Sequence, residues 1–257
     1  MRNVERFWRL LTIATMLVSA LNLGFLHPTS VKAAGTISLT TFTAYSQDFD
    51  TLASSGTANT TIPTGWDFVE TGTGANTTYA ADDGASNGGN TYSYGTTSAT
   101  ERAFGGLLSG SVTPLLGASF TNNTGSAIAE LQISYTGEQW RLGATGRVDR
   151  LDFQYSLDAT SLSTGSWNNV DALDFTAPVT AGTAGKLDGN LSSNRTAISG
   201  SITGLSIANG STVWIRWQEV NASSSDDGLG IDDFSLTPVA AVVTPDLSIN
   251  DVSLNET

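Results

Sequence analysis

The sequence of 257 residues contains no cysteine and only one histidine, His27. Without cysteine it has no disulfide, no thiolate nucleophile and no sulfur ligand for zinc. His27 lies in an N-terminal segment that is predicted below to be removed. The remaining chain then has no imidazole to act as the base of a serine or cysteine hydrolase.

Positive charge is also scarce. Lys and Arg together number 11 against 24 Asp and Glu, which gives a net charge of −13, and charged residues make up only 14% of the chain. Binding to a phosphate backbone depends on clustered Lys and Arg. The sequence therefore predicts no nucleic-acid partner.

A long hydrophobic run occurs only at the N-terminus. Residues 10–26 are almost wholly apolar, follow three arginines and precede the sequence V-K-A-A. This pattern predicts a signal peptide, residues 1–33, and thus a secreted or cell-surface protein; the alternative is a retained membrane anchor. Cleavage removes four basic residues and one acidic residue, which leaves 7 against 23, a charge of −16 and no membrane contact.

The rest of the sequence has the pattern of short β-strands. Residues 150–157 alternate apolar and polar side chains, and residues 129–137 and 213–220 do the same. Further short strands are expected at 66–69, at 91–94 and around Phe49, with 27 glycines supplying turns. About ten strands and no helix longer than a turn or two predict an all-β, antiparallel sandwich.

Aspartates gather near the C-terminal end of this region. Four of them occur within eight residues with no Lys or Arg between them, and two more lie in the expected first strand, which would approach them if the first and last strands pair. Carboxylates are preferred ligands of calcium, so the sequence predicts a structural calcium site; the alternative is that these acids cap turns or stay solvated. The predicted ligands are Asp48, Asp50, Asp226, Asp227, Asp232 and Asp233.

Five tryptophans beyond the signal peptide form either a sugar-stacking platform or part of the core. Trp140 and Arg141 are the pair predicted to bind a glycan, although Arg141 also has Glu138 nearby as an ion-pair partner. Paired carboxylates such as Glu219 and Asp226 would suit glycoside hydrolysis, but 23 acids produce such pairs by chance. No catalytic residue is predicted.

Several motifs resemble a known domain type. The segment D-D-G-L-G-I-D-D-F-S-L resembles the last strand of MAM-like and lectin-like jelly rolls, which lies beside a first strand, here Q-D-F-D-T-L. Together with I-P-T-G-W, Y-T-G-E-Q-W-R and R-L-D-F-Q-Y-S-L, it makes the stretch from about Ser46 to Pro238 similar to the N-terminal jelly roll of large secreted bacterial proteins, and the predicted domain spans residues 34–238. The resemblance implies a concanavalin-like or MAM-like sandwich.

A second, shorter resemblance lies at the end of the chain. After a predicted linker, residues 239–246, the stretch 247–257 resembles the opening strand of a Calx-beta repeat, which implies that the chain is a fragment of a longer protein. The expected function is a non-catalytic extracellular binding or adhesion module whose partners are glycans or cell-surface components. The alternatives are an accessory domain of an endonuclease/exonuclease/phosphatase-type hydrolase with its active site beyond Thr257, and a carbohydrate-binding module.

Overall fold

A computed structural model describes residues 29–32 and 35–242. Most of the predicted signal peptide, residues 243–246 of the predicted linker and the Calx-beta-like stretch lie outside the described residues. Within the described part, the helical structure consists of one 3-10 turn, η1 (Asp171–Leu173). The same part holds no helix with the length and hydropathy of a membrane span.

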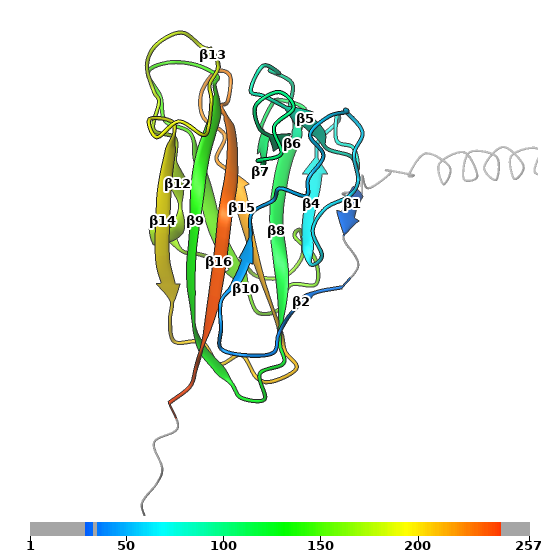
Figure 1. The fold of residues 1–257 in the computed structure, drawn as a ribbon, viewed down its shortest axis with the longest axis vertical. Helices are drawn as coiled ribbons and strands as arrows, with labels where there is room; N and C mark the ends of the chain where they lie inside the picture. The colour runs from blue at the N-terminus through cyan, green and yellow to red at the C-terminus, as the bar shows by residue number, and fades with distance from the viewer. Residues whose placement is uncertain (1–28, 33–34, 243–257) are drawn as a thin grey trace, which may run out of the picture.

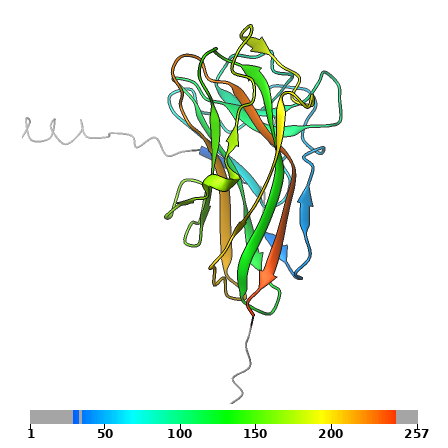
Figure 2. The same cartoon turned by 90° about the vertical axis from the view of Figure 1, so that its left-hand side faces the viewer.

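The strands form two sheets of eight strands each, which face one another as two layers (Figure 1; Figure 2). The first sheet has the order β1 (Thr29–Lys32), β4 (Trp66–Thr71), β8 (Thr113–Asn122), β15 (Thr212–Glu219), β10 (Arg150–Ser156) and β11 (Asn168–Asn169). Two short strands extend it: β2 (Ile37–Leu39) pairs with β8, and β12 (Phe175–Thr176) pairs with β10.

The second sheet has the order β13 (Gly185–Lys186), β9 (Ile128–Leu142), β16 (Gly228–Ala240), β7 (Ala103–Leu107), β6 (Asn90–Tyr94) and β5 (Ala80–Asp82). In addition, β14 (Arg195–Ile202) pairs with β9 and β3 (Tyr45–Gln47) pairs with β16. From β8 to β10, and again from β14 to β16, successive long strands alternate between the sheets, as in a jelly roll. Apart from β2–β8 and β5–β6, the pairings are antiparallel, which confirms the predicted fold class.

The core between the sheets is built around aromatic side chains. Trp66 of β4 and Trp217 of β15 stack with ring centroids 6.0 Å apart, and Phe234 of β16 meets both edge-on. All three are fully buried. The alternating pattern places such residues on the inner face of each strand, so each sheet contributes its own aromatics to a shared core.

Two expectations from the sequence are wrong in detail. The first strand is not centred on Phe49, because β3 ends at Gln47 and Phe49 has a left-handed backbone (φ 56°). Its ring is instead buried in the core, with its centroid 4.6 Å from that of Trp66 and 5.7 Å from that of Phe104. The last strand also runs beyond Pro238, so Val239 and Ala240 belong to β16 and not to a linker.

Candidate functional site: a loop-end pocket and two carboxylate clusters

Four loops meet at one end of the sandwich, the upper end in Figure 1, where β9 ends and β16 begins. The loops β5–β6, β7–β8, β9–β10 and β15–β16 enclose a pocket of about 260 Å³. We call it the loop-end pocket. Its lining residues are Asn87, Leu107, Leu108, Ser109, Gly110, Arg141, Gly143, Ser224, Ser225 and Asp226.

The lining combines hydrogen-bonding groups with a small apolar wall. Arg141, near the end of β9, is half-buried, and its Nη1 donates to the carbonyls of Gly84 (3.2 Å) and Ala85 (3.1 Å). Asp226 supplies a carboxylate, and Leu107 supplies apolar contact. Such a lining can donate to, accept from and pack against a polar ligand.

Trp140, the neighbour of Arg141, is not part of a ligand platform. It is fully buried on the outer face of the second sheet, stacked on Tyr94 at 5.9 Å and covered by the loop that carries Gly189. A Cβ on Gly189 would lie 2.4 Å from the Trp140 indole nitrogen, so this cover is tight. The prediction that Trp140 binds a glycan is therefore wrong: a buried ring offers no face to a sugar.

Most of the other tryptophans are also core residues. Trp66, Trp214 and Trp217 are buried, whereas Trp167 is half-buried and lies over the Arg216 guanidinium at 4.0 Å. The expected five-tryptophan platform does not exist, and Trp167 is its one member that reaches the surface.

A first group of carboxylates lies on the outer face of the second sheet, beside Trp140. It consists of Glu101, just before β7, Glu138 of β9 and Asp232 of β16, and one oxygen from each lies within 4.8 Å of the others. We call it the outer-face cluster. Glu138 is fully buried and Asp232 is 5% exposed. Glu138 Oε1 and Asp232 Oδ1 have no hydrogen-bond partner, although a buried polar oxygen normally has one.

The outer-face cluster brings together carboxyl groups whose charged forms are disfavoured by burial and by mutual repulsion. Burial, followed by the nearby Glu101 charge, raises the pKa of Glu138 to about 7. Burial and the Glu138 charge raise the pKa of Asp232 to about 9. Arg195 compensates this negative charge only weakly, because its side chain is 42% exposed and its Nη1 lies 4.0 Å from Glu138 Oε1. The sequence indicated Glu138 as an ion-pair partner for Arg141, but in the structure Glu138 forms a long ion pair with Arg195 instead.

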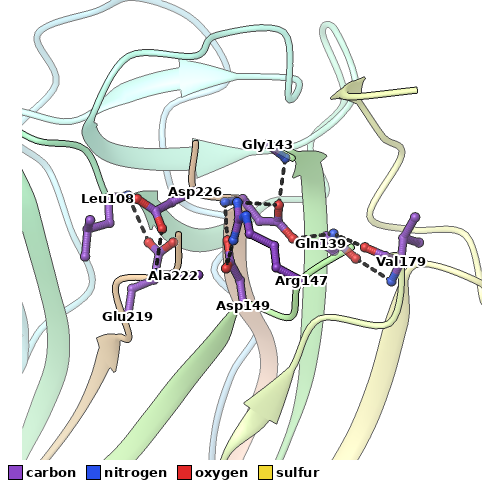
Figure 3. Close-up of polar contacts among 10 residues, drawn as sticks. Leu108, Gln139, Gly143, Arg147, Asp149, Val179, Glu219, Ala222 and Asp226 are labelled. Carbon is purple, nitrogen blue, oxygen red and sulfur yellow. Dashed lines mark hydrogen bonds and ion pairs between the residues drawn. The ribbon is translucent and has the colours of Figure 1, made fainter. Parts of the chain in front are cut away.

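A second group of carboxylates lies beneath the loop-end pocket (Figure 3). It consists of Asp149, Glu219 and Asp226, whose nearest oxygens also lie within 4.8 Å of one another. We call it the loop-end cluster. All three are buried, and each accepts a hydrogen bond from a backbone N–H: Asp227 to Asp149 (2.5 Å), Leu108 to Glu219 (2.9 Å) and Ala222 to Asp226 (3.0 Å).

One arginine balances part of this negative charge. Arg147 pairs with Asp149 and lies 3.5 Å from Asp227, whose carboxylate also accepts from Gly143 (2.6 Å) and Gln139 (2.7 Å). Glu219 is left without such a partner, and Glu219 Oε1 accepts no hydrogen bond. Burial, with Asp226 as the next cause, raises the pKa of Glu219 well above its usual value.

Glu219 and Asp226 are thus close together, as the hydrolase interpretation requires. Glu219, however, is only 3% exposed and is not among the residues that line the pocket, so a sugar ring held in the pocket does not contact it. The arrangement does not fit a glycosidase acid and nucleophile.

The six aspartates predicted as one calcium site are distributed over several places. Asp232 belongs to the outer-face cluster, Asp226 to the loop-end cluster, and Asp227 to the Arg147 ion pair.

The other three members lie apart from these groups. Asp48 and Asp233, both exposed, line a shallow pocket of about 250 Å³ beside β3 and β16, and Asp50 accepts from the Arg102 amide (3.2 Å). The six-ligand site is therefore wrong.

Four of the clustered acids were not assigned to a metal site from the sequence: Glu101 and Asp149 were not singled out, Glu138 was considered as an ion-pair partner, and Glu219 as half of a hydrolase pair. Each is separated from its partners by between 7 and 131 residues, so only the strand pairing brings them together. The one usable signal was an acid within an apolar strand pattern, as at Glu138 and Glu219.

Comparisons with known proteins find no matching family model and no matching curated protein. Among solved structures, TmCBM61 in complex with β-1,4-galactotriose matches with 14% identity and a TM-score of 0.32, over 56% of this chain and 74% of that chain. The K3 adhesin domain of Lys-gingipain from Porphyromonas gingivalis w83 matches with 11% identity and a TM-score of 0.35, over 56% and 78%.

A third match is the CBM22-1–GH10 portion of Clostridium thermocellum xylanase 10B complexed with xylohexaose, with 15% identity and a TM-score of 0.31, over 63% of this chain and 28% of that chain. At these identities the similarity concerns the fold alone.

Proposed function

We propose that the protein is a non-catalytic extracellular binding module that takes a glycan in the loop-end pocket and is stabilised by calcium at the outer-face cluster. The observation that carries the proposal is the polar loop-end pocket at one end of a rigid sandwich. Arg141 and Asn87 supply donors, Asp226 and the serines supply acceptors, and Leu107 supplies an apolar contact. Sugars present hydroxyl groups that donate and accept, next to C–H faces that pack on apolar side chains.

Calcium fits the outer-face cluster because the cluster offers oxygen ligands only. Glu138 Oε1 and Asp232 Oδ1 are buried without hydrogen-bond partners, and Glu101 completes a group of three carboxylates. A hard divalent cation takes oxygen ligands of this kind and would offset their mutual repulsion. The cation would link β9, β16 and the segment before β7 and thus act structurally.

Binding is tested by screening the protein on a glycan array, followed by titration of any glycan found. Arg141→Ala should abolish binding while the melting temperature stays unchanged, because its guanidinium lines the pocket. Trp167→Ala is the matched control at a different surface and should leave binding intact. If Trp167→Ala abolishes binding and Arg141→Ala does not, the ligand site lies over Arg216 and the pocket assignment is wrong.

The calcium part is tested by thermal unfolding in chelator and in millimolar Ca²⁺. Calcium should raise the melting temperature, since a ligand that binds only the folded state stabilises it. Glu138→Gln should remove this rise. Glu130→Gln, a substitution on the same strand outside either cluster, should keep it. An unchanged melting temperature of the wild-type protein in millimolar Ca²⁺ would exclude the calcium site.

A further inference from the structure

The loop-end cluster has features that a structural ion pair does not explain. Four carboxylates gather beneath the pocket, those of Asp149, Glu219, Asp226 and Asp227, and within the described residues Arg147 alone forms ion pairs with them. Arg147 contacts Asp149 and Asp227, the side of the group away from Glu219. Glu219 and Asp226 therefore form an adjacent pair of buried acids with no ion pair of their own, although burial, which raises the pKa of each, is partly opposed by the nearby Arg147 charge (Figure 3).

The backbone holds these acids in a fixed arrangement. Each cluster member accepts one backbone N–H: Glu219 from residue 108 of the β7–β8 loop, and Asp149 and Asp226 from residues 227 and 222 of the β15–β16 loop. These bonds orient the carboxylates and support their ionised forms. The oxygens that remain include Glu219 Oε1, which is buried and unpartnered on a side chain that points toward Asp226 (Figure 3). A buried oxygen of this kind requires a ligand that donates to it or coordinates it.

A route for such a ligand exists. Asp226 belongs to the loop-end cluster and also lines the loop-end pocket, which opens to solvent. An ion entering through the pocket would meet Asp226 first and Glu219 next. The other lining groups include the hydroxyls of Ser109 and Ser225, which are oxygen donors of the type that hard cations accept.

We propose that Asp149, Glu219 and Asp226 form a second divalent-cation site, suited to calcium, on the inner side of the loop-end pocket. The cation binds Glu219 Oε1 together with one oxygen from each aspartate, while Arg147 remains paired with Asp149. It ties the β7–β8, β9–β10 and β15–β16 loops together, because one member or its backbone donor comes from each of them. This site is separate from the outer-face cluster and does not depend on glycan binding.

The experiment is calorimetric titration of the chelator-treated protein with CaCl₂, in parallel with Glu219→Gln, Asp226→Asn, Glu138→Gln and the control Glu130→Gln. The expected stoichiometry is two calcium ions for wild type and Glu130→Gln, and one for each of the other three. Unfolding curves recorded in chelator establish that every variant is folded. Asp226→Asn provides the same test if Glu219→Gln fails to fold.

The outcomes separate the two sites. One calcium ion that is lost in Glu138→Gln and kept in Glu219→Gln and Asp226→Asn would overturn the second site and leave the outer-face site standing. One ion that is lost in Glu219→Gln and kept in Glu138→Gln would support the second site and overturn the first. No calcium binding by the wild-type protein would overturn both.

Discussion

Trp140 and Arg141 are adjacent in sequence and occupy different environments, because successive residues of a strand point to opposite faces. Trp140 is buried against Tyr94 and beneath Gly189, whereas Arg141 reaches the loop-end pocket. The G-E-Q-W-R segment continues the strand that was predicted at residues 129–137, because β9 extends to Leu142. The burial of its tryptophan was not predictable, since the loop that covers it begins more than 40 residues later.

Replacing Trp140 should therefore affect folding and not recognition. Trp140→Ala removes a fully buried indole and its 2.9 Å hydrogen bond to Glu138, so we expect a loss of about 3–5 kcal/mol, or about 10 °C in melting temperature. Arg141→Ala should melt within about 2 °C of wild type, as exposed or half-exposed sites usually do. Thermal unfolding by circular dichroism measures both. Equal melting temperatures for the two variants would contradict the burial of Trp140.

Among the strands, the alternating pattern predicted the position of those with one face in the core. Strand β10 matches the expected range to within one residue, and β15 begins one residue early. The pattern was misleading at Phe49, where a buried aromatic ring lies on a residue with a left-handed backbone. It also did not show which of the two adjacent aspartates of β16 is buried. Asp232 is buried and Asp233 is exposed, so the two acids of the I-D-D-F motif have different surroundings.

The irregularity of β16 at this motif leads to a prediction. The pairing register with β9 shifts between Asp232 and Ser235, and Asp233 has a φ of 48°. A β-branched residue is strained in this left-handed region by about 1–3 kcal/mol, whereas glycine is not. Asp233→Val should therefore melt about 3–6 °C below Asp233→Gly. Both variants remove the same charge, so the difference between their melting temperatures reports the backbone strain at this position. Equal melting temperatures would mean that residue 233 does not adopt the left-handed conformation of a bulge.

For the molecule as a whole, the buried acids predict an unusual dependence of stability on pH. In chelator, Glu138 (pKa about 7) and Asp232 (pKa about 9) keep their protons in the folded state at pH 5, whereas in the unfolded chain their pKa values lie near 4. The folded state therefore binds more protons between pH 5 and pH 9, and its stability falls as the pH rises.

We expect the melting temperature in chelator to decrease by more than about 10 °C from pH 5 to pH 9. The decrease should be smaller in Glu138→Gln, which has no proton to lose there, and smaller in wild type with calcium, which binds the ionised form. Melting curves at one-unit pH intervals provide the measurement. A melting temperature that rises over this range would show that these carboxyl groups are not protonated in the folded protein.

Strand β16 has a mechanical consequence. Its 13 residues pair with β9 along almost their whole length and with β7 and β3 on the other side, and the strand ends at Ala240, opposite the loop-end pocket. Tension applied at that end acts along the strand, perpendicular to its hydrogen bonds. The interstrand hydrogen bonds are then loaded in shear and must break together, instead of breaking one after another. The sandwich would thus resist a pull applied at Ala240 while the pocket at the far end stayed intact.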